Sequence, residues 1–103
     1  MTLKVLVICA ANLNRSPTVA AFLRKKHPDW EVRDAGFFFG YPYQVNQELV
    51  NWADRIYVME REHATRLTYR YGRTRNVAVL GILDEYDRFS PELYAECERI
   101  FKD

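Results

Sequence analysis

The 103-residue sequence is poor in cysteine, glycine and histidine, and each shortage excludes a class of protein. Its two cysteines, Cys9 and Cys97, stand at opposite ends of the chain and cannot form the disulfide framework of a small secreted domain. The four glycines form neither the G-x-G-x-x-G nor the G-x-x-x-x-G-K pattern of a nucleotide-binding loop. His27 and His63 have no partners at metal-ligand spacing, so we expect both on the surface, and we expect no metal and no cofactor.

Long apolar runs and an excess of one charge are also missing. No stretch approaches the ~20 apolar residues that a membrane helix needs. A formal net charge of +1 at pH 7 argues against the basic face of a dedicated nucleic-acid binder. The apolar run near the N-terminus is short and has no convincing signal-peptide cleavage site. We therefore expect a cytoplasmic protein with neither nucleic acid nor membrane as a partner, folded as a single domain over residues 1–103.

What the sequence does contain is a regular alternation of strand-like and helix-like segments. Short apolar or alternating segments predict strands at 4–9, 30–35, 55–59 and 76–83. Segments with helical periodicity lie at 17–26, 45–53 and 64–71, and a last helix starts at Ser90-Pro91. Gly72 is placed to end the third helix. Strands that alternate with helices predict an α/β fold, with a parallel sheet covered by helices on both faces.

The stretch that the chain is organised around is Cys9-Ala10-Ala11-Asn12-Leu13-Asn14-Arg15-Ser16-Pro17, a tight polar loop between the first strand and the first helix. Such a loop can turn several backbone N–H groups inward, and the helix end adds partial positive charge. Arg15 adds a planar guanidinium that matches two phosphate oxygens. Asn12 tolerates the left-handed backbone that a tight loop often needs. Residues 10–16 are therefore the predicted phosphate-binding residues.

Cys9 places a nucleophile in the floor of this anion site. The field at a helix N-terminus favours the thiolate form of a cysteine, and Ser16 is placed to donate a hydroxyl hydrogen bond to the sulfur. A cysteine that ends a buried strand can equally be a small core residue. The polar residues around Cys9 favour the functional role, in which the thiolate accepts a phosphoryl group.

The segment from Val5 to Pro17 resembles the phosphate-binding loop of the low-molecular-weight protein tyrosine phosphatases, where a strand is followed by Cys, five residues and Arg-Ser-Pro. Weaker similarities follow in the order of that family. Asp34-Ala35-Gly36 is similar to the family's Ser-Ala-Gly, and the segment from Ala53 to Met59 resembles its Ala-Asp-x-Ile-x-x-Met strand. Ile82-Leu83-Asp84-Glu85-Tyr86 stands where the family carries its general-acid loop.

The resemblance implies a Rossmann-like phosphatase fold, with a four-stranded parallel sheet of order 2-1-3-4 and the site at its carboxyl edge. The loops after the second and fourth strands would reach the same edge. There Phe39 and Tyr41 would form one wall of a substrate pocket, and Tyr86 would face them. The same rings could instead cover the core of a small domain or make a dimer contact.

The resemblance also implies a proton donor. A phenolate is a poor leaving group, so cleavage of an aryl phosphate benefits from a positioned acid. Asp84 matches the family's acid, and Asp87 is the alternative. With Asp84 in this role, the catalytic residues are Cys9, Arg15 and Asp84.

The sequence departs from the family at several positions. Ala11 stands where the family usually has Gly, Asn14 where it has a second Cys, and Glu85 where it has the Pro after its acid. The chain is also shorter than typical members and resembles a compact subgroup. The shorter chain keeps both catalytic loops, and we expect it to affect the recognition of protein substrates.

The sequence predicts a cysteine-dependent phosphomonoester hydrolase, in first place a protein tyrosine phosphatase that acts through a phosphocysteine. Its partner would be a phosphorylated protein or a small aryl phosphate, with inorganic phosphate as product or inhibitor. One alternative is an arsenate reductase, which would need an external thiol because Cys97 is expected in the core of the last helix. The other is a catalytically weak module that binds phosphate or phosphotyrosine.

Overall fold

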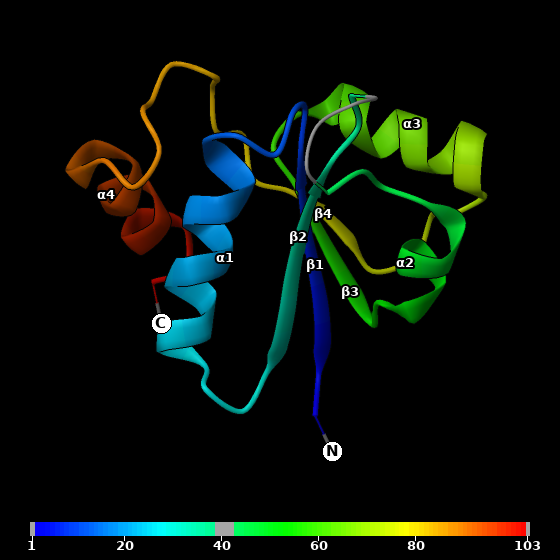
Figure 1. Cartoon of the computed structure of the whole chain (residues 1–103), viewed down its shortest axis with the longest axis horizontal. Coiled ribbons are helices and arrows are strands. Elements are labelled where there is room, and N and C mark those ends of the chain that lie inside the picture. The colour runs from blue at the N-terminus through cyan, green and yellow to red at the C-terminus, as the bar shows by residue number, and fades with distance from the viewer. Residues whose placement is uncertain (1, 39–42, 103) are drawn as a thin grey trace.

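The structure is a computed structural model that describes residues 2–38 and 43–102. Its elements are β1 (Lys4–Cys9), α1 (Arg15–Lys26), β2 (Glu31–Gly36), α2 (Gln47–Trp52), β3 (Arg55–Val58), α3 (Arg61–Tyr71), β4 (Val77–Val79) and α4 (Pro91–Ile100). The four strands form one parallel sheet of order β2-β1-β3-β4, which confirms the predicted topology (Figure 1). Val5 of β1 pairs with Val32 on one side and with Arg55 on the other, so β1 is a central strand.

The side chains of β1 alternate between two hydrophobic cores, one on each face of the sheet. Val5, Val7 and Cys9 pack into the core that α1 and α4 cover. Leu6 and Ile8 pack into the core that α2 and α3 cover. The near-continuous apolar run of β1 is therefore what a strand needs when helices bury both of its faces. Figure 1 shows α1 and α4 on one side of the sheet and α2 and α3 on the other.

The helix ends follow the expected local chemistry. Gly72 adopts the left-handed conformation (φ 67°) and donates its N–H to the carbonyls of Leu67 and Thr68, which ends α3. Ser90 caps α4 by accepting a hydrogen bond from the N–H of Leu93, and Pro91 opens the helix. The first helix begins at Arg15 rather than at residue 17, so the predicted phosphate-binding loop runs directly into its first turn.

The fourth strand is shorter than predicted. The sequence suggested residues 76–83, whereas β4 spans only Val77–Val79. Beyond it, the N–H groups of Gly81 and Ile82 both donate to the carbonyl of Met59, and Gly81 has a positive φ of 73°. Two donors that converge on one acceptor cannot continue the regular spacing of a parallel ladder. The backbone therefore leaves the sheet here and turns toward the first helix.

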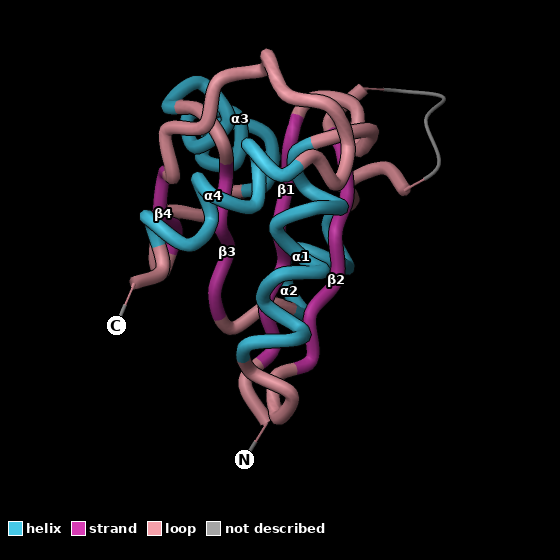
Figure 2. Tube along the Cα trace, turned by 90° about the vertical axis from the view of Figure 1, so that its left-hand side faces the viewer, coloured by secondary structure: helices cyan, strands magenta, loops and turns pink. Residues whose placement is uncertain are grey.

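The loops that follow the strands gather at one end of the molecule. Figure 2 shows the segment after β1 and the long connection between β4 and α4 at the end opposite the N-terminus. This is the carboxyl edge of the sheet, where α/β folds of this kind bind ligands. Among the described residues, no helix is both long and apolar enough to span a membrane.

Candidate active site

Four backbone carbonyls of the loop after β1 accept hydrogen bonds from residues outside that loop. Phe37 and Phe38 donate their N–H groups to Cys9 and Ala10, while the side chain of Arg88 and the N–H of Thr18 donate to carbonyls further along the loop. The four carbonyls engaged in this way are those of Cys9, Ala10, Leu13 and Asn14. These four carbonyls are therefore occupied by donors from outside the loop, and the N–H of Asn12 is directed at Cys9 Sγ, as expected of a loop that binds an oxyanion.

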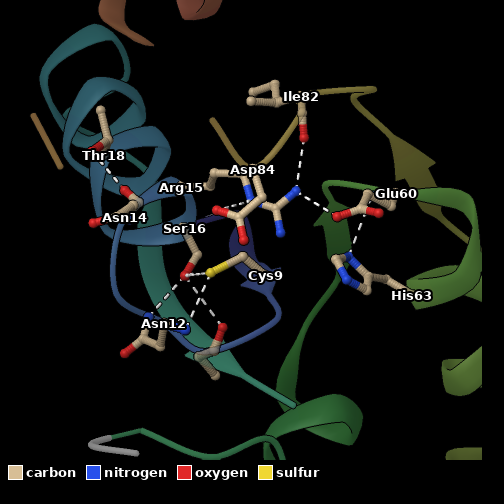
Figure 3. Close-up of polar contacts among 11 residues, drawn as sticks. Cys9, Asn12, Asn14, Arg15, Ser16, Thr18, Glu60, His63, Ile82 and Asp84 are labelled. Carbon is tan, nitrogen blue, oxygen red and sulfur yellow. Dashed lines mark hydrogen bonds and ion pairs between the residues drawn. The ribbon is translucent and has the colours of Figure 1, made fainter. Parts of the chain in front are cut away.

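The sulfur of Cys9 lies in the floor of this loop and receives polar contacts from two residues. The N–H of Asn12 donates to Cys9 Sγ at 3.2 Å, and Ser16 Oγ lies 3.1 Å from the same sulfur (Figure 3). Asn12 has a positive φ of 57°, which is the left-handed conformation that the sequence analysis allowed for at this residue. When Cys9 is a thiolate, Ser16 is the donor in their contact, and both contacts stabilise the negative charge.

Arg15 is buried, with 2% of its side chain exposed, and it is fixed at one nitrogen. Its Nη1 donates to Glu60 Oε2 at 2.7 Å and to the carbonyl of Ile82 at 2.8 Å (Figure 3). Its Nε lies 3.7 Å from Asp84 Oδ1. Among the described residues, none accepts a hydrogen bond from Nη2. The guanidinium is therefore held in place through Nη1, and the N–H groups of Nη2 remain as donors for a bound anion.

Glu60 and His63 are site residues that the sequence analysis missed. The hydrogen bond from Arg15 holds the pKa of Glu60 below its ordinary value, so the carboxylate is ionised beside the guanidinium. His63 was expected on the surface, which is wrong: it is 3% exposed, and its Nδ1 accepts the N–H of Glu60 at 3.3 Å. The two residues form a capping box at the start of α3, and this fixes the backbone from which Glu60 reaches Arg15.

The same residues form the one candidate metal cluster among the described residues, since ligand atoms of Glu60, Glu62 and His63 lie within 4.8 Å of one another. His63, for which the sequence analysis found no partner at metal-ligand spacing, therefore has two carboxylates within reach. However, Glu60 Oε2 is bound to Arg15, and His63 Nδ1 accepts a backbone hydrogen bond. The geometry thus assigns these atoms to positioning the guanidinium.

Asp84 stands at the rim of the loop, and Asp87 does not. A cavity of about 60 Å³ is lined by Cys9, Ala10, Ala11, Leu13, Asn14, Arg15 and Asp84. The carboxylate of Asp84 is 62% exposed and forms an ion pair with Arg15. Asp87 instead accepts the N–H of Ser90 with its backbone carbonyl, at the turn that leads into α4. The structure therefore brings Asp84, of the two candidates, next to the predicted nucleophile.

A larger cavity, of about 590 Å³, lies behind the loop, where Arg24, Asp34 and Leu49 are among its lining residues. Among the described residues that line it, none is a cysteine and none belongs to the loop after β1. A phosphoryl group needs convergent N–H donors more than it needs volume. We therefore place the candidate active site at the small cavity over Cys9.

Solved structures share this arrangement of sheet, helices and loops. One is the tyrosine phosphatase Wzb from Escherichia coli K30 in complex with phosphate, which matches with a TM-score of 0.80 and 22% sequence identity. The match covers 97% of this chain and 94% of the Wzb chain. A further protein tyrosine phosphatase matches with a TM-score of 0.78 and 27% identity, covering 96% of this chain and 90% of its own. The chain has the low-molecular-weight phosphatase fold. The resemblance predicted from the sequence is thereby confirmed.

Not every solved structure with this fold is a tyrosine phosphatase. The YwlE arginine phosphatase from Geobacillus stearothermophilus matches with a TM-score of 0.70 and 24% identity. This match covers 95% of the present chain and 85% of the YwlE chain. All three proteins are phosphatases, and hence hydrolases. No protein-family model and no curated protein matches the sequence.

Backbone geometry explains one departure from the low-molecular-weight phosphatase pattern, at Ala11, and one position where the pattern is kept, at Gly36. Ala11 is not among the described non-glycine residues with positive φ, so an alanine is accommodated where the family has glycine. Gly36 is where close approach is needed, because a Cβ there would lie 2.6 Å from Ala11 C and from Asn12 N. The glycine at the end of β2 therefore lets the loop after β1 pack directly against that strand.

The aromatic residues predicted to wall the phosphatase pocket are only partly accounted for. Phe39 and Tyr41 lie outside the described residues. Tyr86 is half-buried and packs against the core shared by α1 and α4, and it does not line the cavity over Cys9. Phe37 is buried beneath the loop and contacts the ring of His63, with 5.3 Å between the ring centroids. Phe37 thus supports the site from the core.

Proposed function

We propose that this protein is a cysteine-dependent phosphomonoester hydrolase that acts on phosphotyrosine or a similar aryl phosphate. The observation that carries the proposal is the position of Cys9 Sγ, which accepts the N–H of Asn12 and shares one cavity with Arg15 and Asp84. The tyrosine phosphatase Wzb was solved in complex with phosphate. This complex supports the proposal that inorganic phosphate is a product or an inhibitor of the present protein. The mechanism requires neither metal nor cofactor.

The reaction proceeds in two displacements. Cys9 Sγ attacks phosphorus, and the bond between phosphorus and the phenolic oxygen breaks as Asp84, in its acid form, gives that oxygen a proton. The product is a phosphocysteine and a phenol. Asp84, now a carboxylate, takes a proton from water, and the resulting hydroxide attacks phosphorus. The S–P bond then breaks, which returns the thiolate and releases inorganic phosphate.

The rest of the loop stabilises charge on the transferred group. Its N–H donors and the guanidinium of Arg15 face the equatorial oxygens, whose charge has to be balanced as the phosphoryl group moves. Glu60 and the Ile82 carbonyl hold Arg15 in place before substrate arrives. Little reorganisation is then needed in the transition state, and this is the basis for expecting turnover as well as binding.

The second cysteine is unsuited to a redox cycle with the first. Cys97 is fully buried in the core between α1 and α4, and burial raises the pKa of its thiol to about 12. A thiol that stays protonated is neither a good nucleophile nor a good leaving group. An arsenate reductase built on this chain would therefore depend on an external thiol.

The test is metal-free hydrolysis of phenyl phosphate, phosphotyrosine and phosphoarginine by the wild type and Cys9→Ser, with Cys97→Ala as the matched control. We expect Cys9→Ser to lose nearly all turnover and to retain phosphate binding by calorimetry, because a serine hydroxyl is not ionised in this loop. Cys97→Ala should keep its turnover. Rapid acid quench of the wild type should give a phosphorylated peptide that contains Cys9.

Three outcomes count against the proposal. More than a few per cent of wild-type turnover in Cys9→Ser would exclude covalent catalysis through sulfur. Tight phosphotyrosine binding without turnover in the wild type would indicate a binding module. Faster turnover of phosphoarginine than of either aryl ester would assign the chain to the substrate class of the arginine phosphatase it resembles in fold.

A further inference from the structure

Asp34, at the carboxyl end of β2, places a carboxylate directly behind the catalytic loop. Its side chain is 17% exposed. One oxygen, Oδ2, accepts a hydrogen bond from Asn12 Nδ2 at 2.8 Å, and the other, Oδ1, accepts one from Arg24 Nη2 at 3.1 Å. The family that the sequence resembles has a neutral serine at this position. This chain therefore carries a charge where that motif has none.

Asp34 is linked to the nucleophile through a continuous hydrogen-bond chain. Asn12 Nδ2 donates to Asp34 and also to Ser16 Oγ at 2.8 Å, so both of its N–H groups are used. Ser16 Oγ in turn lies 3.1 Å from Cys9 Sγ (Figure 3). Asn12 and Ser16 are both buried, and Ser16 Oγ also lies 3.3 Å from the carbonyl of Ala35, so protein contacts and not water set their orientation.

A lone carboxylate at this position would oppose catalysis. Negative charge a few hydrogen bonds from the sulfur disfavours the thiolate that has to attack phosphorus. Arg24 provides the compensating charge, and its position is fixed independently, because Nε and Nη2 both donate to the carbonyl of Val32 at 3.1 and 2.9 Å. The guanidinium is thus held by the strand backbone at the place where it faces Asp34.

We propose that Arg24 and Asp34 act as a neutral positioning pair for Cys9: the carboxylate orients Asn12 and Ser16 toward the sulfur, and the guanidinium cancels its charge. This proposal rests on the role of Cys9 as nucleophile. It assigns Arg24, on the outer face of α1, a part in the chemistry without contact with the substrate. Neither residue is a catalytic residue, since both act through Asn12.

The experiment measures alkylation of Cys9 by iodoacetamide at pH 6, which follows the thiolate and needs no turnover. Modification is located by peptide mass spectrometry in variants shown by thermal melting to be folded. We expect Arg24→Gln to slow alkylation about threefold at low salt, because it leaves the carboxylate uncompensated. Arg24→Lys should restore the rate, since it keeps the charge. Asp34→Asn keeps an oxygen that can accept the hydrogen bond from Asn12 and removes the charge, so it should not slow alkylation, and the double variant should lie within about twofold of wild type.

The matched control is Arg33→Gln. Arg33 lies on β2 and pairs with the exposed Glu31 at 3.3 Å, and within the described part of the chain it makes no hydrogen bond or ion pair with the catalytic loop. The substitution removes the same charge next to Asp34 in the sequence but on β2 instead of α1, so it should leave alkylation unchanged. The slowing in Arg24→Gln should also shrink in 1 M NaCl, because half of the Arg24 side chain is exposed and its field is screened. A purely structural effect would persist in salt.

Some results would contradict the proposed role of Arg24 and Asp34. Equal slowing in Arg24→Gln and Arg33→Gln would show a general effect of net charge. Slowing in Asp34→Asn as large as in Arg24→Gln would show that the carboxylate does not oppose the thiolate. Failure of the proposed hydrolysis is seen separately, as turnover that survives Cys9→Ser, and it would leave the alkylation results intact.

Discussion

At the scale of single residues, the main finding is that a buried arginine is positioned by a partner from a distant part of the chain. Arg15 is 2% exposed, and a cation taken out of water needs a compensating charge and hydrogen-bond acceptors. Glu60 supplies the charge and the carbonyl of Ile82 supplies a second acceptor. Both bonds are made by Nη1, so they fix the plane of the guanidinium as well as its location.

A first prediction follows for Glu60. Glu60→Ala leaves Arg15 Nη1 with the Ile82 carbonyl alone, and we expect kcat to fall roughly 10–100-fold, the usual effect of an unpaired buried charged group. Glu60→Gln keeps an acceptor and should lose less. Phosphate affinity should change less than kcat in both variants, because a misplaced guanidinium still attracts an anion.

Steady-state kinetics with an aryl phosphate and phosphate inhibition constants measure this split. The control is Glu62→Gln, an exposed carboxylate on the same turn of α3 that has no hydrogen bond to Arg15 among the described residues. Equal losses in Glu62→Gln and Glu60→Gln would mean that the charge of the helix start matters and the contact with Arg15 does not.

At the scale of elements, the connection between β4 and α4 is attached to the catalytic loop at several points. Arg88 Nε donates to the carbonyl of Leu13 at 2.6 Å, and the N–H of Phe89 donates to Thr18 Oγ1 at 2.8 Å. At its other end the Ile82 carbonyl accepts from Arg15. Asp84 is therefore carried on a connection whose two ends are fixed against α1 and the loop that precedes it.

A second prediction separates the two candidate acids on this connection. Asp84→Asn should reduce turnover of phenyl phosphate by about 10²–10⁴-fold, the usual contribution of a general acid, and turnover of 4-nitrophenyl phosphate much less. A nitrophenolate leaves without help, so the acid matters little there. Asp87→Asn should show no such difference, because Asp87 lies at the turn before α4 and does not line the cavity.

The measurement is kcat/KM for both esters in both variants. If the leaving-group dependence appears in Asp87→Asn instead, the two roles are exchanged. If it appears in neither variant, the proton comes from another group, and the assignment of this connection as the acid loop is wrong.

At the scale of the whole molecule, the site and the stability of the fold share a buried histidine. His63 lies at the start of α3, contacts Phe37 from the segment after β2 and accepts the N–H of Glu60. Burial lowers the pKa of His63, so the folded protein keeps it neutral where the unfolded chain would take up a proton. The start of α3 is therefore expected to be sensitive to acid.

A third prediction concerns this pH dependence. The stabilisation from a neutral His63 is fully present above the unfolded pKa of about 6.5 and is lost progressively as the pH falls below it. His63→Gln keeps an acceptor for the N–H of Glu60, since glutamine serves at this position of a capping box, but does not titrate. We expect the free energy of unfolding to fall less between pH 7.5 and pH 5 in His63→Gln than in the wild type.

Urea unfolding at the two pH values measures this difference. His27→Gln is the control, because it removes the other histidine, which is half-exposed and stacks on Trp30 with ring centroids 3.8 Å apart. A pH dependence that is the same in His63→Gln and the wild type would contradict the role given to burial.

The sequence by itself determined the features that depend on local order. The apolar run of Lys4–Cys9 is a strand at its predicted limits, Gly72 and Ser90 mark a helix end and a helix start, and Asn12 has the left-handed backbone expected of it. Each depends on a residue and its immediate neighbours, so a linear pattern suffices. The motif from Cys9 to Pro17 is also recognisable from local sequence, because its residues are contiguous between the end of β1 and the start of α1.

The tertiary structure alone decided which distant groups complete the site. Glu60 lies 45 positions from Arg15, the Ile82 carbonyl lies 67 positions from it, and Asp34 lies 22 positions from Asn12. These pairs meet because neighbouring parallel strands end at one edge of the sheet and because Gly81 turns the chain out of β4. Burial likewise converts His63, which has no distinguishing local pattern, into a structural residue. No periodicity encodes such contacts, since they depend on how the strands are placed side by side.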